Sequence, residues 1–78
     1  MNVRVLFFGK LRRDVGQSEL ELTLTPAATV RDAATALEGQ LSLSLAGHMA
    51  AVNENYASPE HPLEAGDTVA FLPPVAGG

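Results

Sequence analysis

The sequence predicts an α+β fold, in which a mixed β-sheet is covered on one face by one main helix. Residues 19–24 alternate between apolar and polar side chains, which is typical of a strand that is buried on one face. Residues 3–8 and 68–72 are largely apolar on both faces, which indicates strands at the centre of a sheet. Residues 30–41 repeat apolar side chains at helical spacing, which predicts the helix.

The first predicted strand, residues 3–8, presents two apolar faces. By the two-residue period of a strand, one face holds Val3, Val5 and Phe7, and the other holds Arg4, Leu6 and Phe8. Residues 10–15 then predict a short helical turn, and Gly16 is a common helix stop. The half-exposed strand 19–24 follows, and its pattern fits an edge strand or an antiparallel partner of the first strand.

The main helix has a clear signal at its start. Thr29 is the predicted N-cap, and Asp32 follows three residues later, as in a capping box. The apolar stripe of the helix consists of Val30, Ala34, Leu37 and Leu41. Gly39 weakens the helix, so we expect its end between Leu37 and Leu41. Residues 42–47 fit a strand and a helix equally well.

The second half of the chain predicts further strands. Residues 49–53 and 68–72 read as strands, and a short strand is expected at Tyr56 and Ala57. Turns are predicted at residues 53–55 and 65–67 because of their Asn, Gly and Asp content. The first and last strands are the most apolar, so we place them side by side at the centre. This order of elements is that of a single β-grasp domain, residues 1–78.

The composition argues against several classes of function. The 78 residues include no cysteine, and no apolar run is long enough to cross a membrane. A net charge of −4, with five lysines and arginines, argues against nucleic acid as a partner. His48 and His61 lie thirteen positions apart without a matching carboxylate cluster, so no metal site is expected. No signal peptide is visible before the first strand, and we expect a cytoplasmic protein.

The chain ends in a thin C-terminal tail, residues 73–78, which comprises Pro73, Pro74, Val75, Ala76, Gly77 and Gly78. The prolines stiffen the tail near its base, and the glycines remove side-chain bulk beside the terminal carboxylate. From Pro74 to Gly78 an extended chain spans about 17 Å, enough to enter the active site of another protein. Because residues 75–78 have no apolar partner of their own, we expect the tail to be extended or mobile in the isolated protein.

No catalytic set of side chains is visible in the sequence. It has no cysteine nucleophile, no glycine-rich phosphate loop and no His-Glu pair at metal spacing. The terminal carboxylate of Gly78 becomes reactive after activation, for example as an adenylate. That step needs ATP and a second enzyme, because no nucleotide site is visible here. We therefore predict a carrier or substrate that binds no cofactor and is no enzyme on its own; the alternative is a chain end without a function.

Three stretches of the chain resemble one known family. They read VRVLFFGKLR near the start, AVNENY in the second half and GDTVAFLPPVAGG at the end. Together they are similar to the ubiquitin-like β-grasp sulfur-carrier subunits of molybdopterin synthase, and the similarity runs from Val3 to Gly78. Two positions depart from the family pattern: Leu72 stands where many relatives have phenylalanine, and Ala65 replaces a common acidic residue.

The resemblance implies a function for the tail. In this family the terminal glycine is adenylated by an adenylyltransferase similar to ubiquitin-activating enzymes, and is then converted to a thiocarboxylate with sulfur from a donor enzyme. The tail enters the large synthase subunit, where the sulfur passes to cyclic pyranopterin monophosphate in molybdenum cofactor synthesis. Carried over, Gly78 is the modified residue and Gly77 its slender approach. The resemblance also implies a heterotetramer of two small and two large subunits.

A partner-binding surface is a further expectation. Phe8 and Leu72 are predicted on one face of neighbouring central strands, where they form an apolar patch for the large subunit. The alternative is that both lie under a loop. Tyr56 is a weaker candidate for the same role. Arg12 and Arg13 are expected on a solvated turn rather than in specific ion pairs.

Two other functions use the same kind of tail. Related carriers that serve thiamine or transfer-RNA thiolation also end in Gly-Gly, although the Pro-Pro-Val before it favours molybdopterin synthesis. A ubiquitin-like protein modifier instead joins its terminal glycine to lysine side chains of other proteins.

Overall fold

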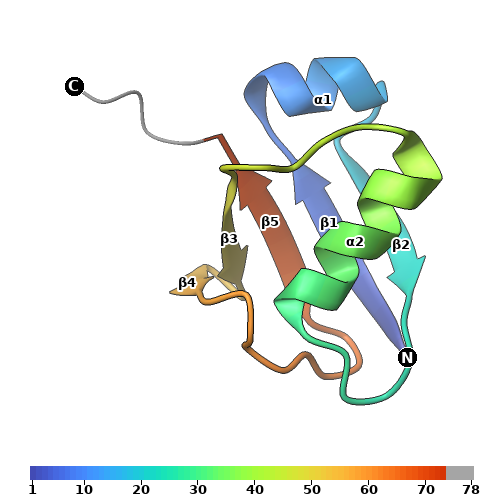
Figure 1. Ribbon diagram of the computed structural model, residues 1–78, viewed down its shortest axis with the longest axis vertical. Helices are drawn as coiled ribbons and strands as arrows, with labels where there is room; N and C mark the ends of the chain where they lie inside the picture. The colour runs from blue at the N-terminus through green and yellow to red at the C-terminus, as the bar shows by residue number, and fades with distance from the viewer. Residues whose placement is uncertain (74–78) are drawn as a thin grey trace.

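The computed structural model describes residues 1–73, and it has the predicted β-grasp architecture (Figure 1). Its elements are β1 (Asn2–Phe7), α1 (Gly9–Val15), β2 (Glu19–Thr23), α2 (Val30–Leu41), β3 (Met49–Val52), β4 (Asn55–Ala57) and β5 (Thr68–Leu72). In this part of the chain the strands form one five-stranded sheet in the order β2-β1-β5-β3-β4. Helix α2 covers one face of the sheet, and α1 lies at the end of the sheet where β1 ends.

The two most apolar strands, β1 and β5, are parallel neighbours inside the sheet, as the sequence predicts. Phe7 of β1 is paired with Phe71 of β5. The outer neighbours are antiparallel: β2 pairs with β1, and β3 pairs with β5. Because β5 has a strand on each side, the element that leads into the tail is held by backbone hydrogen bonds along both edges.

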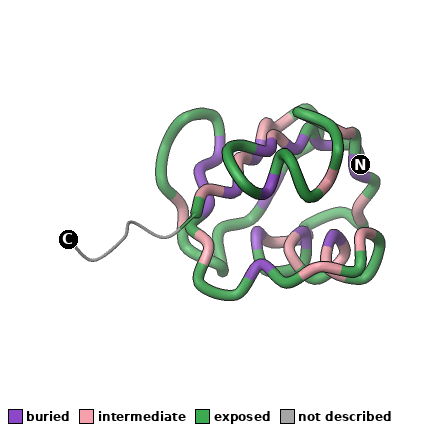
Figure 2. Tube along the Cα trace, turned by 90° about the horizontal axis from the view of Figure 1, so that it is seen from above, coloured by how far each residue is buried: buried purple, intermediate pink, exposed green. Residues whose placement is uncertain are grey.

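The hydrophobic core lies between the sheet and α2. Val5, Phe7 and Val69 of the sheet are at most 1% exposed, and Ala33 and Leu37 of α2 are fully buried in the same cluster. Figure 2 shows the buried positions of α2 along the side that faces the sheet. Complete burial of an apolar side chain of this size stabilises a protein by about 1.5–3 kcal/mol. The face under α2 is therefore the face on which the fold depends.

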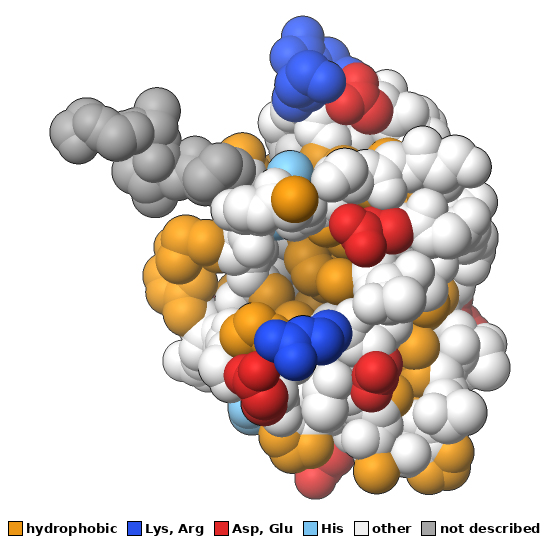
Figure 3. Space-filling view, viewed as in Figure 1, with side chains coloured by type: hydrophobic (Ala, Val, Ile, Leu, Met, Phe, Trp, Pro, Cys, Tyr) orange, Lys and Arg blue, Asp and Glu red, His pale blue; other side chains and the backbone are white. Residues whose placement is uncertain are grey.

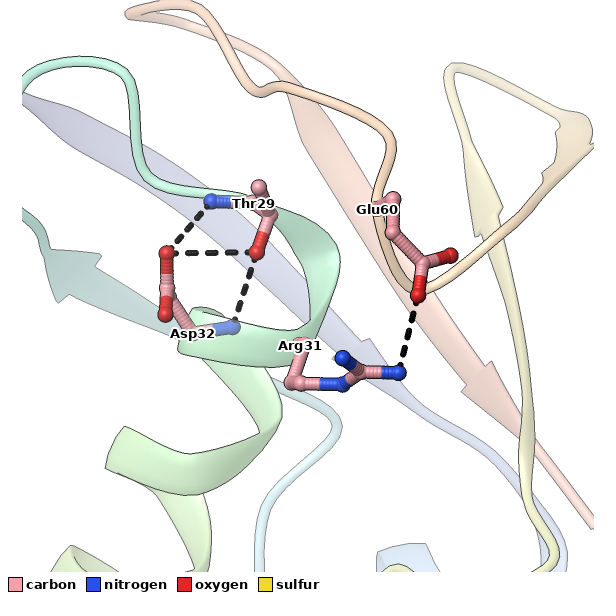
Figure 4. Close-up of polar contacts among 4 residues, drawn as sticks. All are labelled: Thr29, Arg31, Asp32 and Glu60. Atoms are coloured by element: carbon pink, nitrogen blue, oxygen red, sulfur yellow. Dashed lines mark hydrogen bonds and ion pairs between the residues drawn. The ribbon is translucent and has the colours of Figure 1, made fainter.

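The start of α2 has the predicted capping box, shown in Figure 4. The Thr29 hydroxyl accepts a hydrogen bond from the Asp32 backbone N–H at 3.3 Å. The Asp32 carboxylate in turn accepts from the Thr29 backbone N–H at 2.9 Å. Next to it, the Arg31 guanidinium donates to the Glu60 carboxylate at 2.9 Å. These contacts fix the first turn of the helix and link it to the loop before β5.

The structure corrects some details of the prediction. Phe8 does not belong to the first strand, because Gly9 turns the chain with a φ of 57° and Phe8 becomes the N-cap of α1. Helix α2 continues past Gly39 to Leu41, the far limit of the expected range. Ala33 is fully buried, whereas the predicted stripe residue Ala34 is half-buried. Residues 42–47 form neither a strand nor a helix.

Candidate functional site

The base of the tail is the end of β5. Leu72 is the last residue of this strand and is half-buried, and Pro73 after it is exposed. The tail therefore begins where a central, doubly paired strand ends. The other predicted tail residues are Pro74, Val75, Ala76, Gly77 and Gly78. They lie outside the described residues, and so does the expected extension or mobility of the tail.

The opposite end of β5 is fixed by side-chain hydrogen bonds. The Asn53 amide donates to the Asp67 carboxylate at 3.0 Å, and its oxygen accepts from the Thr68 backbone N–H at 3.0 Å. Asp67 also accepts from the Glu64 backbone N–H at 2.8 Å. These bonds connect the turn between β3 and β4 with the turn before β5. The strand that bears the tail is thus anchored at its start and paired along its length, so it presents the tail base in a fixed direction.

The sheet face opposite α2 carries a group of apolar side chains, which we call the open-face patch. Strand pairing aligns them in two rows, because paired residues share a face. The first row is Leu6, Ala70, Ala51 and Tyr56, and the second contains the pair Leu72 and Met49. Phe8 follows β1 in an extended conformation, so its side chain continues the alternation onto the same face as the second row. In the described part of the chain, the exposed large hydrophobic residues all belong to this patch: Phe8 is 45% exposed, Met49 41% and Tyr56 70%. Contiguous exposed apolar surface is typical of a protein-interaction site.

The predicted partner residues Phe8, Leu72 and Tyr56 lie together on this patch. Phe8 is one position beyond the pair Phe7–Phe71, which brings it beside Leu72 on the neighbouring strand. Phe8 is exposed, so no loop within residues 1–73 covers it, and the predicted alternative of a position under such a loop is wrong for Phe8. Their role in binding stays a prediction. The sequence analysis missed Met49, which is paired with Leu72; its place two residues before Ala51 in a strand was the available signal.

The open-face patch ends at a polar border on β2. Arg4 and Glu19 form an ion pair with an N–O distance of 3.5 Å across β1 and β2. The Asn2 amide donates to the Glu21 carboxylate at 2.7 Å, and the Thr23 hydroxyl donates to Asn2 at 3.0 Å. These exposed polar side chains form ion pairs and hydrogen bonds with one another. Among the described residues, the apolar part of this face therefore lies on β3, β4, β5, the end of β1 and Phe8 directly after it.

A hollow of about 400 Å³ lies on the other side of the sheet, between α2 and β4, and Figure 3 shows its apolar interior. Its walls include Val30, Ala34, Ala50 and Phe71, and atoms of Met49 and Tyr56 also line it. His48 lies in the wall, with a buried Nδ1 that has no hydrogen-bond partner among the described residues. The lining offers no nucleophile beside a base, so this hollow has no visible catalytic chemistry.

The described residues meet neither the requirements of a metal site nor those of a membrane-spanning helix. Within residues 1–73, no three His, Asp or Glu side chains are grouped as metal ligands would be. No helix in that part of the chain has the length and apolar character that a membrane crossing requires.

Comparison with known proteins gives consistent matches along the chain. The ThiS family matches residues 5–78. The chain is 39% identical to the molybdopterin synthase sulfur carrier subunit of Escherichia coli (strain K12), over 97% of this chain and 99% of that protein. The crystal structure of SAMP1 from Haloferax volcanii superposes with a TM-score of 0.86 and 25% identity, and all of both chains is covered. A chain in the complex of subunits 1 and 2 of molybdopterin-converting factor from Helicobacter pylori 26695 has a TM-score of 0.60 and 26% identity, again with full coverage of both chains.

Proposed function

The chain belongs to the ThiS family, and on this premise we propose that it is the sulfur-carrier subunit of a molybdopterin synthase. The observation that supports this most directly is the 39% identity to the Escherichia coli sulfur carrier subunit over 97% of the chain. The family match extends to residue 78, so it includes both terminal glycines.

The reacting group in this proposal is the carboxylate of Gly78. Its oxygen attacks the α-phosphorus of ATP on a separate adenylyltransferase, which releases pyrophosphate and leaves an acyl-adenylate. Sulfur supplied at the sulfide level by a donor enzyme then attacks the acyl carbon, AMP leaves, and a thiocarboxylate remains. In the large synthase subunit the thiocarboxylate sulfur forms a bond to a carbon of cyclic pyranopterin monophosphate, and water then cleaves the acyl–sulfur bond, which leaves the sulfur on the pterin and restores the Gly78 carboxylate. The chain itself binds no cofactor in this scheme and is the sulfur-donating, non-catalytic subunit.

The fold supports this role because β5, the tail and the open-face patch each have a separate part in it. The paired strand β5 fixes the tail base, and an extended chain from Pro74 to Gly78 would supply a reach of about 17 Å. The open-face patch supplies apolar surface next to the tail base for the large subunit, through Phe8, Leu72 and Tyr56. Subunits 1 and 2 of the Helicobacter pylori factor form a complex, which supports a large-subunit partner. We extend the proposal to a heterotetramer of two small and two large subunits in the cytoplasm.

The test is the intact mass of the protein isolated from its own cells. We expect a fraction heavier by about 16 Da, the difference between sulfur and oxygen in a thiocarboxylate. The matched control is the protein from cells that lack the adenylyltransferase, in which this fraction should be absent. Absence of the heavier form from normal cells under conditions of active molybdenum cofactor synthesis would contradict the proposal.

A second candidate function is protein modification. The observation that favours it is the similarity to SAMP1, a small archaeal modifier protein, over the full chain. A modifier would join the Gly78 carbonyl to lysine amines through isopeptide bonds. Antibody detection in cell extracts separates the two functions. A modifier gives a ladder of larger conjugates, whereas a carrier gives one band at the size of the free chain. A carrier for thiamine or transfer-RNA thiolation would show the same thiocarboxylate but would not support dithiolene formation with the large synthase subunit.

A further inference from the structure

The charge of this chain is unevenly distributed. The net charge is −4, from five lysines and arginines against nine aspartates and glutamates. Helix α1 holds three of the five cations, Lys10, Arg12 and Arg13, and one of the nine acids, Asp14. The helix therefore has a charge of +2, and the remainder of the chain has a charge of −6. Figure 3 shows basic side chains gathered at the top, over α1, while the other basic side chain visible on this face lies among acidic ones.

The cations outside this pair of arginines are neutralised by neighbours. Arg4 pairs with Glu19 at 3.5 Å, Lys10 with Asp14 at 2.8 Å and Arg31 with Glu60 at 2.9 Å. Arg12 and Arg13 are exposed, and neither has an ion pair with a described residue. We call these two side chains the α1 basic pair.

The position of α1 relative to the tail base is fixed by packing. Leu11 is 6% exposed and belongs to the core cluster, so it holds the helix in place. Arg12 and Arg13 follow it at about 100° and 200° around the helix axis, and both point away from the core. Lys10, Leu11 and Asp14 line the same shallow hollow as Pro73, the first tail residue. The basic pair therefore lies on the helix that flanks the exit of the tail.

A local stabilising role explains only part of this arrangement. Both arginines lie in the last turn of α1, where a cation interacts favourably with the helix dipole. The interaction with the helix dipole requires one cation in the last turn, and it does not depend on where the helix lies in the protein. It does not account for two arginines that have no ion-pair partner within residues 1–73 and lie at the tail exit of an acidic protein.

We propose that the α1 basic pair contacts acidic side chains that border the tail-receiving opening of the large synthase subunit. The inference rests on the proposed function, because a partner that takes up the tail must lie against the end of the domain from which the tail leaves. The separation of +2 on α1 from −6 elsewhere also orients the carrier during approach, with its tail end toward an acidic rim. The pair thus acts on the rate and orientation of docking and leaves the chemistry at Gly78 unchanged.

The experiment measures the association rate constant of the full-length carrier with the purified large synthase subunit of the same organism. The variants are Arg12→Glu, Arg13→Glu, their combination and the neutral pair Arg12→Gln with Arg13→Gln. The control is Arg31→Glu at an exposed, ion-paired site on α2, which makes the same charge change as either single reversal. At low salt, we expect the combined reversal to slow association by about tenfold and the control by less than about twofold. Close to 1 M salt, where the screening length falls to about 3 Å, the difference should disappear.

Two further readouts separate the possible results. The thermal midpoint of the neutral pair shows whether loss of the dipole interaction has destabilised the fold. Sulfur transfer at saturating carrier should equal that of the parent chain, because only docking is slowed. Equal association rates for the parent and the combined reversal would overturn the inference while the proposed function stands. Slowing by Arg31→Glu that equals the slowing by the single reversals would overturn it too. Failure of the parent chain to bind the large subunit would overturn both.

Discussion

The two faces of the central strands have similar apolar sequences and opposite surroundings. Phe7 and Phe8 are adjacent, yet Phe7 is 1% exposed beneath α2 and Phe8 is 45% exposed on the open face. On β5, Phe71 is buried and Leu72 is half-buried. Side-chain chemistry alone therefore does not separate core from interaction surface in this fold. The position of α2 determines which face becomes the core, because α2 covers one face and the described chain leaves the other face open.

The largest effect should come from the buried member of the phenylalanine pair. Phe7→Ala should lower the free energy of unfolding by about 3–5 kcal/mol, because it leaves a cavity in the core. Phe8→Ala is the matched control and should cost less than about 1 kcal/mol, since the side chain is already partly in water. Urea unfolding followed by circular dichroism measures both. Equal losses would show that the two faces are not distinct.

The reverse contrast is expected for binding. Phe8→Asp and Leu72→Asp should each weaken complex formation with the large subunit by about tenfold or more, because the core of an interface disfavours charge. Their far-ultraviolet circular dichroism should match that of the parent chain. Calorimetric titration with the large subunit gives the affinity, and Glu21→Gln, at the polar border of the same face, serves as the control. Unfolding of the Asp variants would assign these side chains to the core instead.

A smaller effect is expected where α2 begins. Thr29→Ala removes the hydroxyl that accepts from the Asp32 N–H, and should cost about 0.5–2 kcal/mol of stability. The helix lies on the face away from the patch, so affinity for the large subunit should stay unchanged. Thr29→Ser keeps the hydroxyl and is the control. A loss of affinity in the stable Thr29→Ala protein would mean that the two faces are coupled.

The smallest effect should come from the polar border of the open face. Glu19→Gln breaks the ion pair with Arg4. The side chains of both residues are more than half exposed. Exposed pairs of this kind contribute about 0–1 kcal/mol, and both stability and affinity should hardly change. Thermal unfolding and the same calorimetric titration check this. A clear loss of affinity would extend the binding surface across β2.

The sequence predicted the layout of the fold because its local signals agree with the final packing. The capping box at Thr29 and Asp32 formed as expected, since both halves of the motif are local. The central pairing of β1 and β5 followed from their two apolar faces. The end of β1 was missed at Phe8, where an apolar residue continues the strand pattern and the turn at Gly9 breaks it.

The candidate site was predicted in part. Leu72 and Tyr56 come from two strands and Phe8 from the end of a third, and the strand order brings them to one face. Met49 was missed because the exposure of a strand residue depends on whether a helix lies over it, which periodicity does not reveal. The sequence also did not predict which cations form ion pairs, since residues such as Arg31 and Glu60 are far apart in the sequence and meet only in the folded chain.

The central claim is that function lies in the terminal carboxylate and its reach. Deleting Gly78 leaves an unhindered carboxylate on Gly77 but shortens the tail by about 3.5 Å. Misplacement by about 1 Å can cost around a hundredfold in rate, so the shortened carrier should fail. The measurement is dithiolene formation by the large subunit with carrier that has been thiocarboxylated beforehand, and unfolding confirms that stability is within about 0.5 kcal/mol of the parent. The account predicts loss of product with an intact fold, and full activity without Gly78 would contradict it.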